Sequence, residues 1–338
     1  MVKNLLIALS LVTPALGVVV ANYSDATNLR FDNDPSFIGN SHDWSGVGRV
    51  SATPDTGPFS HHREWATLIG DNYFISANHF KPTTGDTITF ASGNSPGSPT
   101  FNYTVAGGFA VPGTDFWIGY TEAAMEASLK RYSMTTVAAN NLADTGLAGN
   151  TLLMSGDHIT GGPGTLSATV VGTNQAESFV NSGATSINTP EHTINFTPTD
   201  SASFDWLVTF QNLNSDTANT FTNHEAQVQS GDSGSPLFNV SGGELEIVGI
   251  AFSVFSEPID GNFIDTPGGP GTPNDPLEAR QGSIYSYPGS YETEINATIA
   301  LVPDPTPEPS TVMLLLLSTT SLFRRNRSAL PRRFSIDA

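Results

Sequence analysis

One short segment of the sequence places a serine among glycines, whose backbone can adopt the conformations that a catalytic serine turn uses. Residues 231–236 read Gly-Asp-Ser-Gly-Ser-Pro, with Ser233 between two glycines. Glycine adopts backbone conformations that other residues resist. Such a turn can expose a hydroxyl while its N–H groups converge on one point, which is the arrangement of an oxyanion-binding site. Gly-Asp-Ser-Gly is also ordinary turn chemistry, so a catalytic role for Ser233 depends on a partner elsewhere in the chain.

That partner must be a base, because a serine hydroxyl is a weak nucleophile at neutral pH. The chain has seven histidines, and His79 differs from the rest in its setting. It follows the apolar run 73–75 and three small residues, so it stands at the start of a loop where an imidazole can face a cleft. We predict that His79 is the base. The other histidines lie in polar segments or near the N-terminus, where a solvated position is the default: His42, His61, His62, His158, His192 and His224.

The segments around both residues resemble those of the trypsin-like serine proteases. Residues 65–79, Trp-Ala-Thr-Leu-Ile-Gly-Asp-Asn-Tyr-Phe-Ile-Ser-Ala-Asn-His, are similar to the strand, turn and strand of that family that end in Thr-Ala-Ala-His. The hexapeptide at 231–236 is similar to the family's Gly-Asp-Ser-Gly-Gly-Pro. The two motifs occur in the family's order, which makes the resemblance more specific than either motif alone.

The resemblance implies a third member, an aspartate between the two motifs that orients the histidine. Asp115 is the best match because it leads directly into an apolar strand, in Gly-Thr-Asp-Phe-Trp-Ile at 113–118, where the family has Asp-Ile-Ala-Leu. Phe116 and Trp117 are bulkier than the family's aliphatic residues. Asp86 is the reserve candidate, and a purely structural turn aspartate is the remaining alternative.

In the mechanism that the resemblance implies, His79 takes the proton of Ser233 during attack on an acyl carbon and returns it to the leaving amine. The backbone N–H groups of Gly231 and Ser233 would form the oxyanion hole. This chemistry uses protein groups alone, so we expect neither a metal ion nor a cofactor. Because the chain has no cysteine, thiol catalysis and thiolate metal sites are excluded.

Two features depart from the family. The residue at the base of its specificity pocket lies six positions before the serine, and that position is Gln227 here. A neutral amide lacks the carboxylate that selects Arg or Lys, so we expect a neutral side chain before the cleaved bond. In many zymogens of the family, the residue matching Asp232 pairs with a new N-terminal amine that begins Ile-Val-Gly-Gly. This block is missing, and the nearest sequence is the valine run 18–20, so bacterial relatives that form the oxyanion site without such a pair are the better comparison.

The composition is typical of an all-β protein. The 338 residues include 32 Gly and 23 Pro, which favours short strands joined by tight turns. The resemblance extends over roughly residues 45–300 and implies two antiparallel six-stranded β-barrels with the site in the cleft between them. Helical patterns occur at 122–130 and 292–299, and the second of these predicts a short C-terminal helix.

The expected barrels divide the middle of the chain. We assign residues 45–135, with His79 and Asp115, to the first barrel and residues 136–302, with Ser233, to the second. Residues 22–44 form a preceding N-terminal segment.

The first 21 residues have the layout of a secretory signal peptide. Lys3 precedes a mostly apolar run at 5–12, and small residues follow at Ala15, Gly17 and Ala21. The apolar stretch is short and interrupted by a proline, which makes a membrane-spanning helix the weaker interpretation. We therefore expect residues 1–21 to be removed during export.

The last 36 residues, 303–338, change in character. Alternating prolines form a stiff linker, and a 12-residue apolar run follows at 312–323. Five arginines lie beyond this run. Pro-Glu-Pro-Ser at 307–310 followed by these parts resembles the PEP-CTERM sorting signal of Gram-negative bacteria. The resemblance implies transient association with the inner membrane and a sorting protease that cuts near the motif. An incidental, disordered tail is the alternative.

Charge narrows the choice of partners. Residues 22–302 carry 7 Lys or Arg against 29 Asp or Glu, so nucleic acid is an unfavourable partner. We expect a secreted or cell-surface serine endopeptidase that acts on proteins or peptides through a Ser-His-Asp triad. The alternative from another class is a catalytically inactive, protease-like β-barrel that serves as a surface or matrix binding module. An esterase that uses the same triad is a third possibility.

Overall fold

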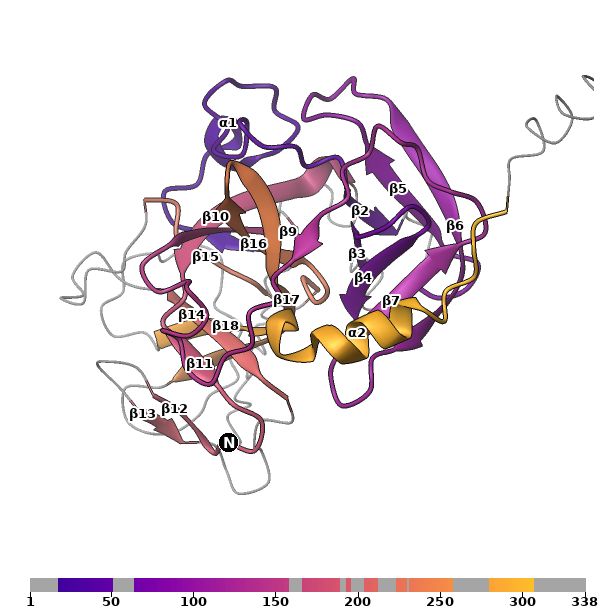
Figure 1. Cartoon of the computed structure of the whole chain (residues 1–338). Helices are drawn as coiled ribbons and strands as arrows, with labels where there is room; N and C mark the ends of the chain where they lie inside the picture. Colours follow the sequence, from indigo (N-terminus) through magenta and orange to yellow (C-terminus); the bar gives the residue numbers. More distant parts are fainter. Residues whose placement is uncertain are drawn as a thin grey trace, which may run out of the picture.

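The structure is a computed structural model that describes residues 18–50, 64–157, 166–188, 193–195, 204–211, 223–229, 231–257 and 280–306. It is built almost entirely of antiparallel strands, with one short helix near the C-terminus (Figure 1). The all-β class and the C-terminal helix predicted from the sequence are confirmed. The predicted signal peptide up to residue 17, and the tail from residue 307, lie outside the described residues.

The first half of the molecule is a closed six-stranded barrel. Its strands follow one another around the barrel in the order β2-β3-β4-β7-β6-β5. Apolar side chains that alternate along these strands fill the interior, and Phe74, Ile88 and Phe90 are fully buried there. The strands are β2 (Val47–Val50), β3 (Trp65–Leu68), β4 (Tyr73–Ala77), β5 (Thr87–Ala91), β6 (Thr100–Ala110) and β7 (Phe116–Thr121).

The second half is an eight-stranded sheet. Seven strands run in the order β10-β9-β16-β17-β18-β14-β11, and β8 (Ser133–Met134) pairs with β17. Apolar residues from both ends of this order, such as Met154 and Leu207, pack into one core. The seven strands are β9 (Thr151–Asp157), β10 (Thr169–Gln175), β11 (Ser178–Val180), β14 (Trp206–Gln211), β16 (Pro236–Ser241), β17 (Glu244–Glu257) and β18 (Arg280–Ser286).

Two short strand pairs lie beside this sheet. β12 (Ser186–Asn188) pairs with β13 (Thr193–Asn195), and β1 (Val19–Val20) pairs with β15 (Ala226–Gln227). Val18 and Val20 are buried, and the N–H of Val18 donates to the carbonyl of Asp157 at 2.7 Å. The last residues of the segment that the sequence assigned to the leader are therefore part of the folded structure.

The N-terminal segment is tied to the first barrel by one buried arginine. Helix α1 (Asp25–Asn28) is capped by Ser24, whose hydroxyl accepts the N–H of Thr27. Arg30 follows it, with its side chain 1% exposed. Its guanidinium donates to the carbonyls of Val47, Ala91 and Gly93 and to the side chain of Asn94.

Helix α2 (Glu292–Ile299) follows the last strand and a short 3-10 turn at Pro288–Tyr291. It buries Ile295 and Thr298, and the chain then continues onto the first barrel (Figure 1). There, Asn72 Nδ2 donates to the carbonyl of Pro303 at 3.0 Å, and the N–H of Thr306 donates to the carbonyl of Glu122 at 2.8 Å. The C-terminal segment thus joins the two halves.

The helical pattern at 122–130 does not form a helix, so this prediction is wrong. Met125 and Leu129 are buried against the first barrel, as an amphipathic pattern requires. The carbonyls of Met125, Glu126 and Leu129, however, accept hydrogen bonds from the Arg131 guanidinium. A side chain therefore satisfies the backbone groups that a helix would have paired internally.

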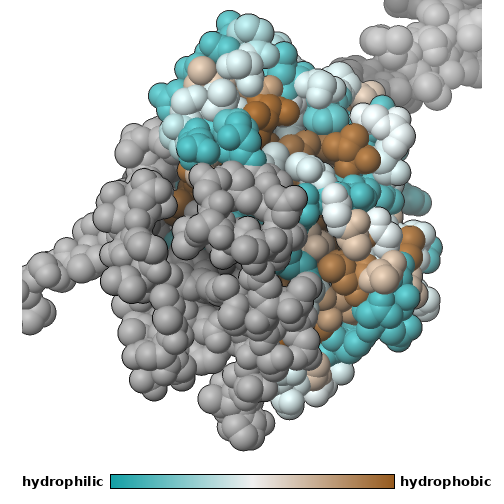
Figure 2. Space-filling model, turned by 90° about the vertical axis from the view of Figure 1, so that its left-hand side faces the viewer, coloured by the Kyte–Doolittle hydropathy of each residue, from teal (hydrophilic) through white to brown (hydrophobic). Residues whose placement is uncertain are grey.

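The described surface is largely polar. Figure 2 shows one face on which hydrophobic residues gather in small groups between hydrophilic ones. Among the described residues, the exposed large apolar side chains are Val137, Val240 and Leu301. Within the same part of the chain, no helix is long and apolar enough to cross a membrane.

Candidate active site

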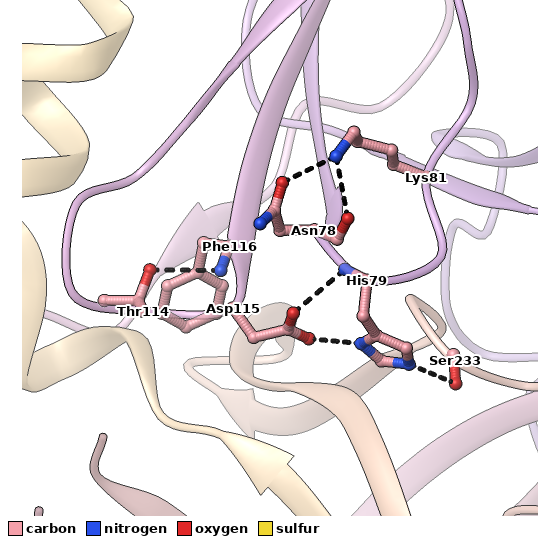
Figure 3. A network of polar contacts seen from close by, with 7 residues as sticks. All are labelled: Asn78, His79, Lys81, Thr114, Asp115, Phe116 and Ser233. Atoms are coloured by element: carbon pink, nitrogen blue, oxygen red, sulfur yellow. Dashed lines mark hydrogen bonds and ion pairs between the residues drawn. The ribbon is translucent and has the colours of Figure 1, made fainter. Parts of the chain in front are cut away.

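Strand pairing in the first barrel brings His79 and Asp115 together. β4 ends at Ala77, which lies opposite Phe116 at the start of β7. The residues just outside this pair therefore meet: the N–H of Asn78 donates to the carbonyl of Asp115 at 2.5 Å, and the N–H of His79 donates to Asp115 Oδ1 at 3.0 Å. His79 Nδ1 lies 2.6 Å from Asp115 Oδ2 (Figure 3).

The second half of the molecule supplies Ser233, whose Oγ lies 2.8 Å from His79 Nε2 (Figure 3). Because the carboxylate of Asp115 can only accept, Nδ1 carries the proton of the neutral imidazole. Nε2 is then free to accept the hydroxyl proton of Ser233. The structure thus brings together all three residues that the sequence predicted to form the triad, in a chain of contacts from carboxylate to imidazole to hydroxyl.

The side chains of Asp115 and His79 differ in their access to solvent. The side chain of Asp115 is 8% exposed, whereas that of His79 is 39% exposed. A buried carboxylate next to an imidazole stabilises the imidazolium that forms when the ring takes a proton. The exposed edge of His79 leaves room for a substrate beside the base.

Short-range hydrogen bonds hold the loops that carry His79 and Asp115. Lys81 Nζ donates to the backbone carbonyl of Asn78 at 2.8 Å and to its side-chain oxygen at 2.7 Å. Thr114 Oγ1 donates to the carbonyl of Val111 and accepts the N–H of Phe116 (Figure 3). These contacts fix the direction from which each side chain enters the site.

The bulk of Phe116 and Trp117, which departs from the family pattern, is accommodated in the core. Phe116 is fully buried, and its ring lies 6.5 Å from that of Tyr291. Trp117 lies edge-on to Phe74 over the backbone of Gly108, where a Cβ atom would come within 2.1 Å of the indole. A glycine on the neighbouring strand therefore provides the space for the larger ring.

Asp86, the reserve candidate, has a local partner. Its carboxylate accepts the N–H of Thr83 at 2.6 Å and the hydroxyl of Thr83 at 2.7 Å. This is the geometry of a turn aspartate. His79 contacts Asp115.

The loop at 231–235, which we call the oxyanion loop, uses glycine at two strained positions. Gly231 and Gly234 have φ values of 99° and 88°. Gly234 also lies against β4, where a Cβ atom would come within 2.7 Å of Ser76 Oγ and 3.2 Å of the nitrogen of Ala77. Both the conformation and the close approach exclude a larger residue at Gly234.

The N–H groups of the oxyanion loop divide into two sets. Those of Asp232, Gly234 and Ser235 donate to backbone carbonyls at 2.9–3.0 Å. Those of Gly231 and Ser233, which the sequence analysis assigned to the oxyanion hole, have no acceptor among the described residues. A free N–H on the nucleophilic residue itself and another two residues before it are the kind of donors that a developing oxyanion requires.

The side chain of Asp232 anchors the loop from the interior. It is fully buried, and its two oxygens accept the N–H groups of Asp157 at 2.7 Å and Gln229 at 2.9 Å. Burial raises the pKa of Asp232 to about 7, although the two backbone hydrogen bonds act in the opposite direction.

Gln227, the predicted base of the specificity pocket, lies in β15 and is 3% exposed. Its Nε2 makes a long contact of 3.4 Å with the carbonyl of Gly282, and its Oε1 has no hydrogen-bond partner among the described residues. The next residue, Val228, donates its N–H to Ser283 Oγ at 3.1 Å. The structure therefore places Gln227 beside β18, at Gly282 and Ser283.

An aromatic cluster beside His79 had no signal in the sequence. The ring of Phe252, in β17, meets the imidazole edge-on at 5.4 Å between centroids. Phe204 and Trp206 pack against Phe252 at 4.9 and 5.9 Å. Of these rings, Phe252 contacts the imidazole. Trp206 lies in β14 and Phe252 in β17, so only the folded chain brings them together.

Comparison with known proteins gives distant matches. No protein-family model and no curated protein matches the chain. Two inactivated protease paralogues of the scabies mite have similar structures. SMIPP-S-I1 is 13% identical, with a TM-score of 0.43 over 76% of this chain and 95% of its own. SMIPP-S-D1 is 11% identical, with a TM-score of 0.44 over 77% of this chain and 94% of its own. Similarity this low assigns no activity to the present chain.

Proposed function

We propose that this chain is an exported serine endopeptidase of the trypsin-like kind, with Ser233 as nucleophile, His79 as base and Asp115 as the residue that orients the base. One observation carries the proposal: Asp115 Oδ2, the two nitrogens of His79 and Ser233 Oγ form a continuous chain with spacings of 2.6 and 2.8 Å. Hydrogen-bonded contact between nucleophile, base and orienting carboxylate is the geometric signature of this mechanism.

In the first half of the reaction, Ser233 Oγ attacks the carbonyl carbon of the scissile peptide bond while its proton passes to His79 Nε2. The carbonyl oxygen becomes an oxyanion that the N–H groups of Gly231 and Ser233 hold. The imidazolium, stabilised by Asp115, then gives its proton to the leaving amine. An ester between Ser233 and the acyl half of the substrate remains.

In the second half, water takes the place of the departed amine. His79 removes a proton from this water, which attacks the ester carbonyl and forms a second oxyanion in the same hole. When the intermediate collapses, the proton returns to Ser233 Oγ and the acid product leaves. An ester substrate would follow the same steps, so esterase activity is a secondary property of the proposed site.

The rival proposal is a catalytically inactive binding module. The two scabies mite neighbours are inactivated proteases, and a protein of this architecture can therefore exist without activity. In this chain, however, the nucleophile, base and carboxylate are all present and in contact. This observation favours an enzyme.

A fluorophosphonate probe tests the proposal. We expect it to label one serine, identified as Ser233 by mass spectrometry, and we expect Ser233→Ala to remove both labelling and casein hydrolysis. Ser235→Ala is the matched control: Ser235 lies two residues further along the same loop, and its buried hydroxyl has no hydrogen-bond partner among the residues that the structure describes. Casein hydrolysis at the wild-type rate in Ser233→Ala would rule out the assignment, and an unlabelled, inactive wild type would favour the binding module.

Export and sorting complete the proposal. We propose that residues 303–338 retain the protein at the inner membrane of a Gram-negative host until a sorting protease cuts near 307–310. Sequencing the C-terminal peptide of the protein outside the cells tests this idea. An exported chain that still ends at Ala338 would contradict it.

A further inference from the structure

A buried ion pair joins the two halves of the molecule close to the oxyanion loop. Arg49 lies in β2 of the first barrel, and Asp157 is the last residue of β9 in the second sheet. Two parallel contacts link them, Nη1 to Oδ1 at 2.8 Å and Nη2 to Oδ2 at 2.9 Å. The side chains are 1% and 7% exposed, and the guanidinium lies 4.4 Å from the ring centroid of Trp65. Such a bidentate ion pair fixes the relative orientation of the two side chains as well as the distance between them.

The backbone of Asp157 continues this connection to the loop. Its N–H donates to Asp232 Oδ1 at 2.7 Å, and its carbonyl accepts the N–H of Val18. Asp232 immediately precedes Ser233. A path of direct contacts therefore runs from β2, on the half that carries His79, to the loop that carries the nucleophile.

Charge gives Arg49 a role that an apolar residue could not take. Asp157 and Asp232 are buried carboxyl groups that lie close together; the charge of Asp157 acts to raise the pKa of Asp232, and Arg49 acts to lower it. Without the guanidinium, two acidic groups would lie together in the interior with no cation opposite them. A buried pair is in itself weak evidence for stability, because apolar side chains often replace such pairs without loss. The bidentate geometry of the Arg49–Asp157 pair points instead to a role in positioning the oxyanion loop.

We propose that Arg49 and Asp157 are positioning residues for the oxyanion hole. The ion pair fixes the backbone at Asp157, the N–H of Asp157 fixes the carboxyl group of Asp232, and this carboxyl group fixes the N–H groups that receive the oxyanion. The inference rests on the proposed function. It also gives the loop an anchor within the fold, in a chain that lacks the Ile-Val-Gly-Gly start.

The test compares Arg49→Met and Arg49→Lys with Arg30→Met. Arg30 is an equally buried arginine whose guanidinium donates to backbone carbonyls and to Asn94. We expect kcat for a peptide amide to fall about 10²-fold in Arg49→Met, as when one oxyanion donor is lost, with KM within about twofold. Arg49→Lys keeps the positive charge but cannot make the bidentate contact, so its kcat should lie between those of Arg49→Met and wild type. Arg30→Met should lower the melting temperature and leave kcat within about threefold.

Inhibitor binding separates positioning from general stability. A peptide aldehyde forms an adduct with Ser233 whose oxygen occupies the oxyanion hole, whereas the corresponding peptide alcohol does not. We expect Arg49→Met to weaken aldehyde binding about as much as it lowers kcat and to leave alcohol binding unchanged. Equal losses for both inhibitors, or equal effects of Arg49→Met and Arg30→Met, would reduce the pair to a structural role and overturn the proposal.

Hydrogen exchange distinguishes failure of this inference from failure of the proposed function, because it needs no hydrolysis. We expect the peptide that spans 231–241 to exchange faster in Arg49→Met than in wild type or Arg30→Met, even in a protein that cleaves nothing. Unchanged hydrogen exchange in Arg49→Met would refute the proposal that the Arg49–Asp157 pair holds the oxyanion loop in place. If Arg49→Met does not fold, the isosteric Asp157→Asn is measured in the same way, and unchanged exchange there would likewise count against the proposal.

Discussion

Gly234 packs against Ser76 at the contact between the two halves, with no space for a methyl group between them. A Cβ atom at Gly234 would come within 2.7 Å of Ser76 Oγ, and φ at Gly234 is 88°. We expect Gly234→Ala to displace Ser233 from His79 and to lower kcat about 10²-fold or more, because a displacement of about 1 Å has effects of that size. The measurement is kcat for a peptide amide.

The control for this substitution is Gly243→Ala in the turn between β16 and β17. Gly243 has φ 90°, the same strain, but nothing lies within 4 Å of its Cβ position. Gly243→Ala should lower the free energy of unfolding by about 1–2 kcal/mol and leave kcat unchanged. Equal kcat losses in both variants would show that strain, and not the contact with Ser76, is responsible.

Replacing Asp115 tests the orientation of the base. Asp115→Asn keeps the shape of the side chain but removes the charge and favours the wrong tautomer of His79, so kcat should fall about 10⁴-fold. Asp86→Asn is the matched control and should change kcat less than about twofold, since the carboxylate of Asp86 accepts its hydrogen bonds from Thr83 in its own turn. A larger effect at Asp86 than at Asp115 would reverse the assignment.

The assignment of Gln227 to the base of the specificity pocket predicts that a carboxylate at this position would favour cleavage after Arg or Lys. With Gln227 at the base, cleavage after Arg or Lys should be poor, because a buried cation would lack a counter-charge. Gln227→Glu has the same size and adds a carboxylate. A charge-assisted hydrogen bond of about 1.5–3 kcal/mol would raise kcat/KM for basic residues about tenfold to a hundredfold. Peptide-library profiles of both proteins measure this change, and a wild-type preference for basic residues would show that the pocket base lies elsewhere.

Asp232 predicts a direction for the pH dependence of stability. Its pKa is raised by burial from an ordinary value of 3.8 to about 7, so the folded protein holds a proton there that the unfolded chain releases at lower pH. The contribution of this group is therefore fully present below about pH 4 and is lost as the pH rises towards about 7. Melting temperatures of wild type and Asp232→Asn across this window should show the decline only in wild type.

The position of β1 predicts which residues the exported protein keeps. Val19 and Val20 pair with Gln227 and Ala226, and the side chain of Val18 is 3% exposed. Removal of this strand would expose part of the second core and take away a neighbour of Gln227. In place of the cut after residue 21 expected from the sequence, we therefore predict that export processing occurs before Val18. N-terminal sequencing of the exported protein measures this, and a mature chain that begins after Ala21 would contradict it.

The sequence predicted those parts of the site that depend on local pattern. The apolar strand before His79 and the glycine turn around Ser233 can be recognised from neighbouring residues alone, and the order of the two motifs predicts their meeting. Asp115 required the family comparison, because an aspartate before an apolar strand is common. The short helix at 292–299 was predicted from its periodicity.

Features that depend on distant residues had no such signal. Arg49 and Asp157 are 108 positions apart, and nothing near either residue indicates a partner. Phe252 reaches His79 only because β17 passes the end of β4. The periodicity at 122–130 was misleading for a local reason, since the guanidinium of the neighbouring Arg131 binds the carbonyls that a helix would have used.

The hydrogen bonds of Pro303 and Thr306 determine where a pull on the C-terminus would act. Their partners, Asn72 and Glu122, belong to the first barrel, so tension applied beyond Thr306 loads that barrel first. The oxyanion loop belongs to the other half. A pull on the tail would therefore act first on the half that holds His79 and Asp115, and it would reach Ser233 through the contacts between the two halves.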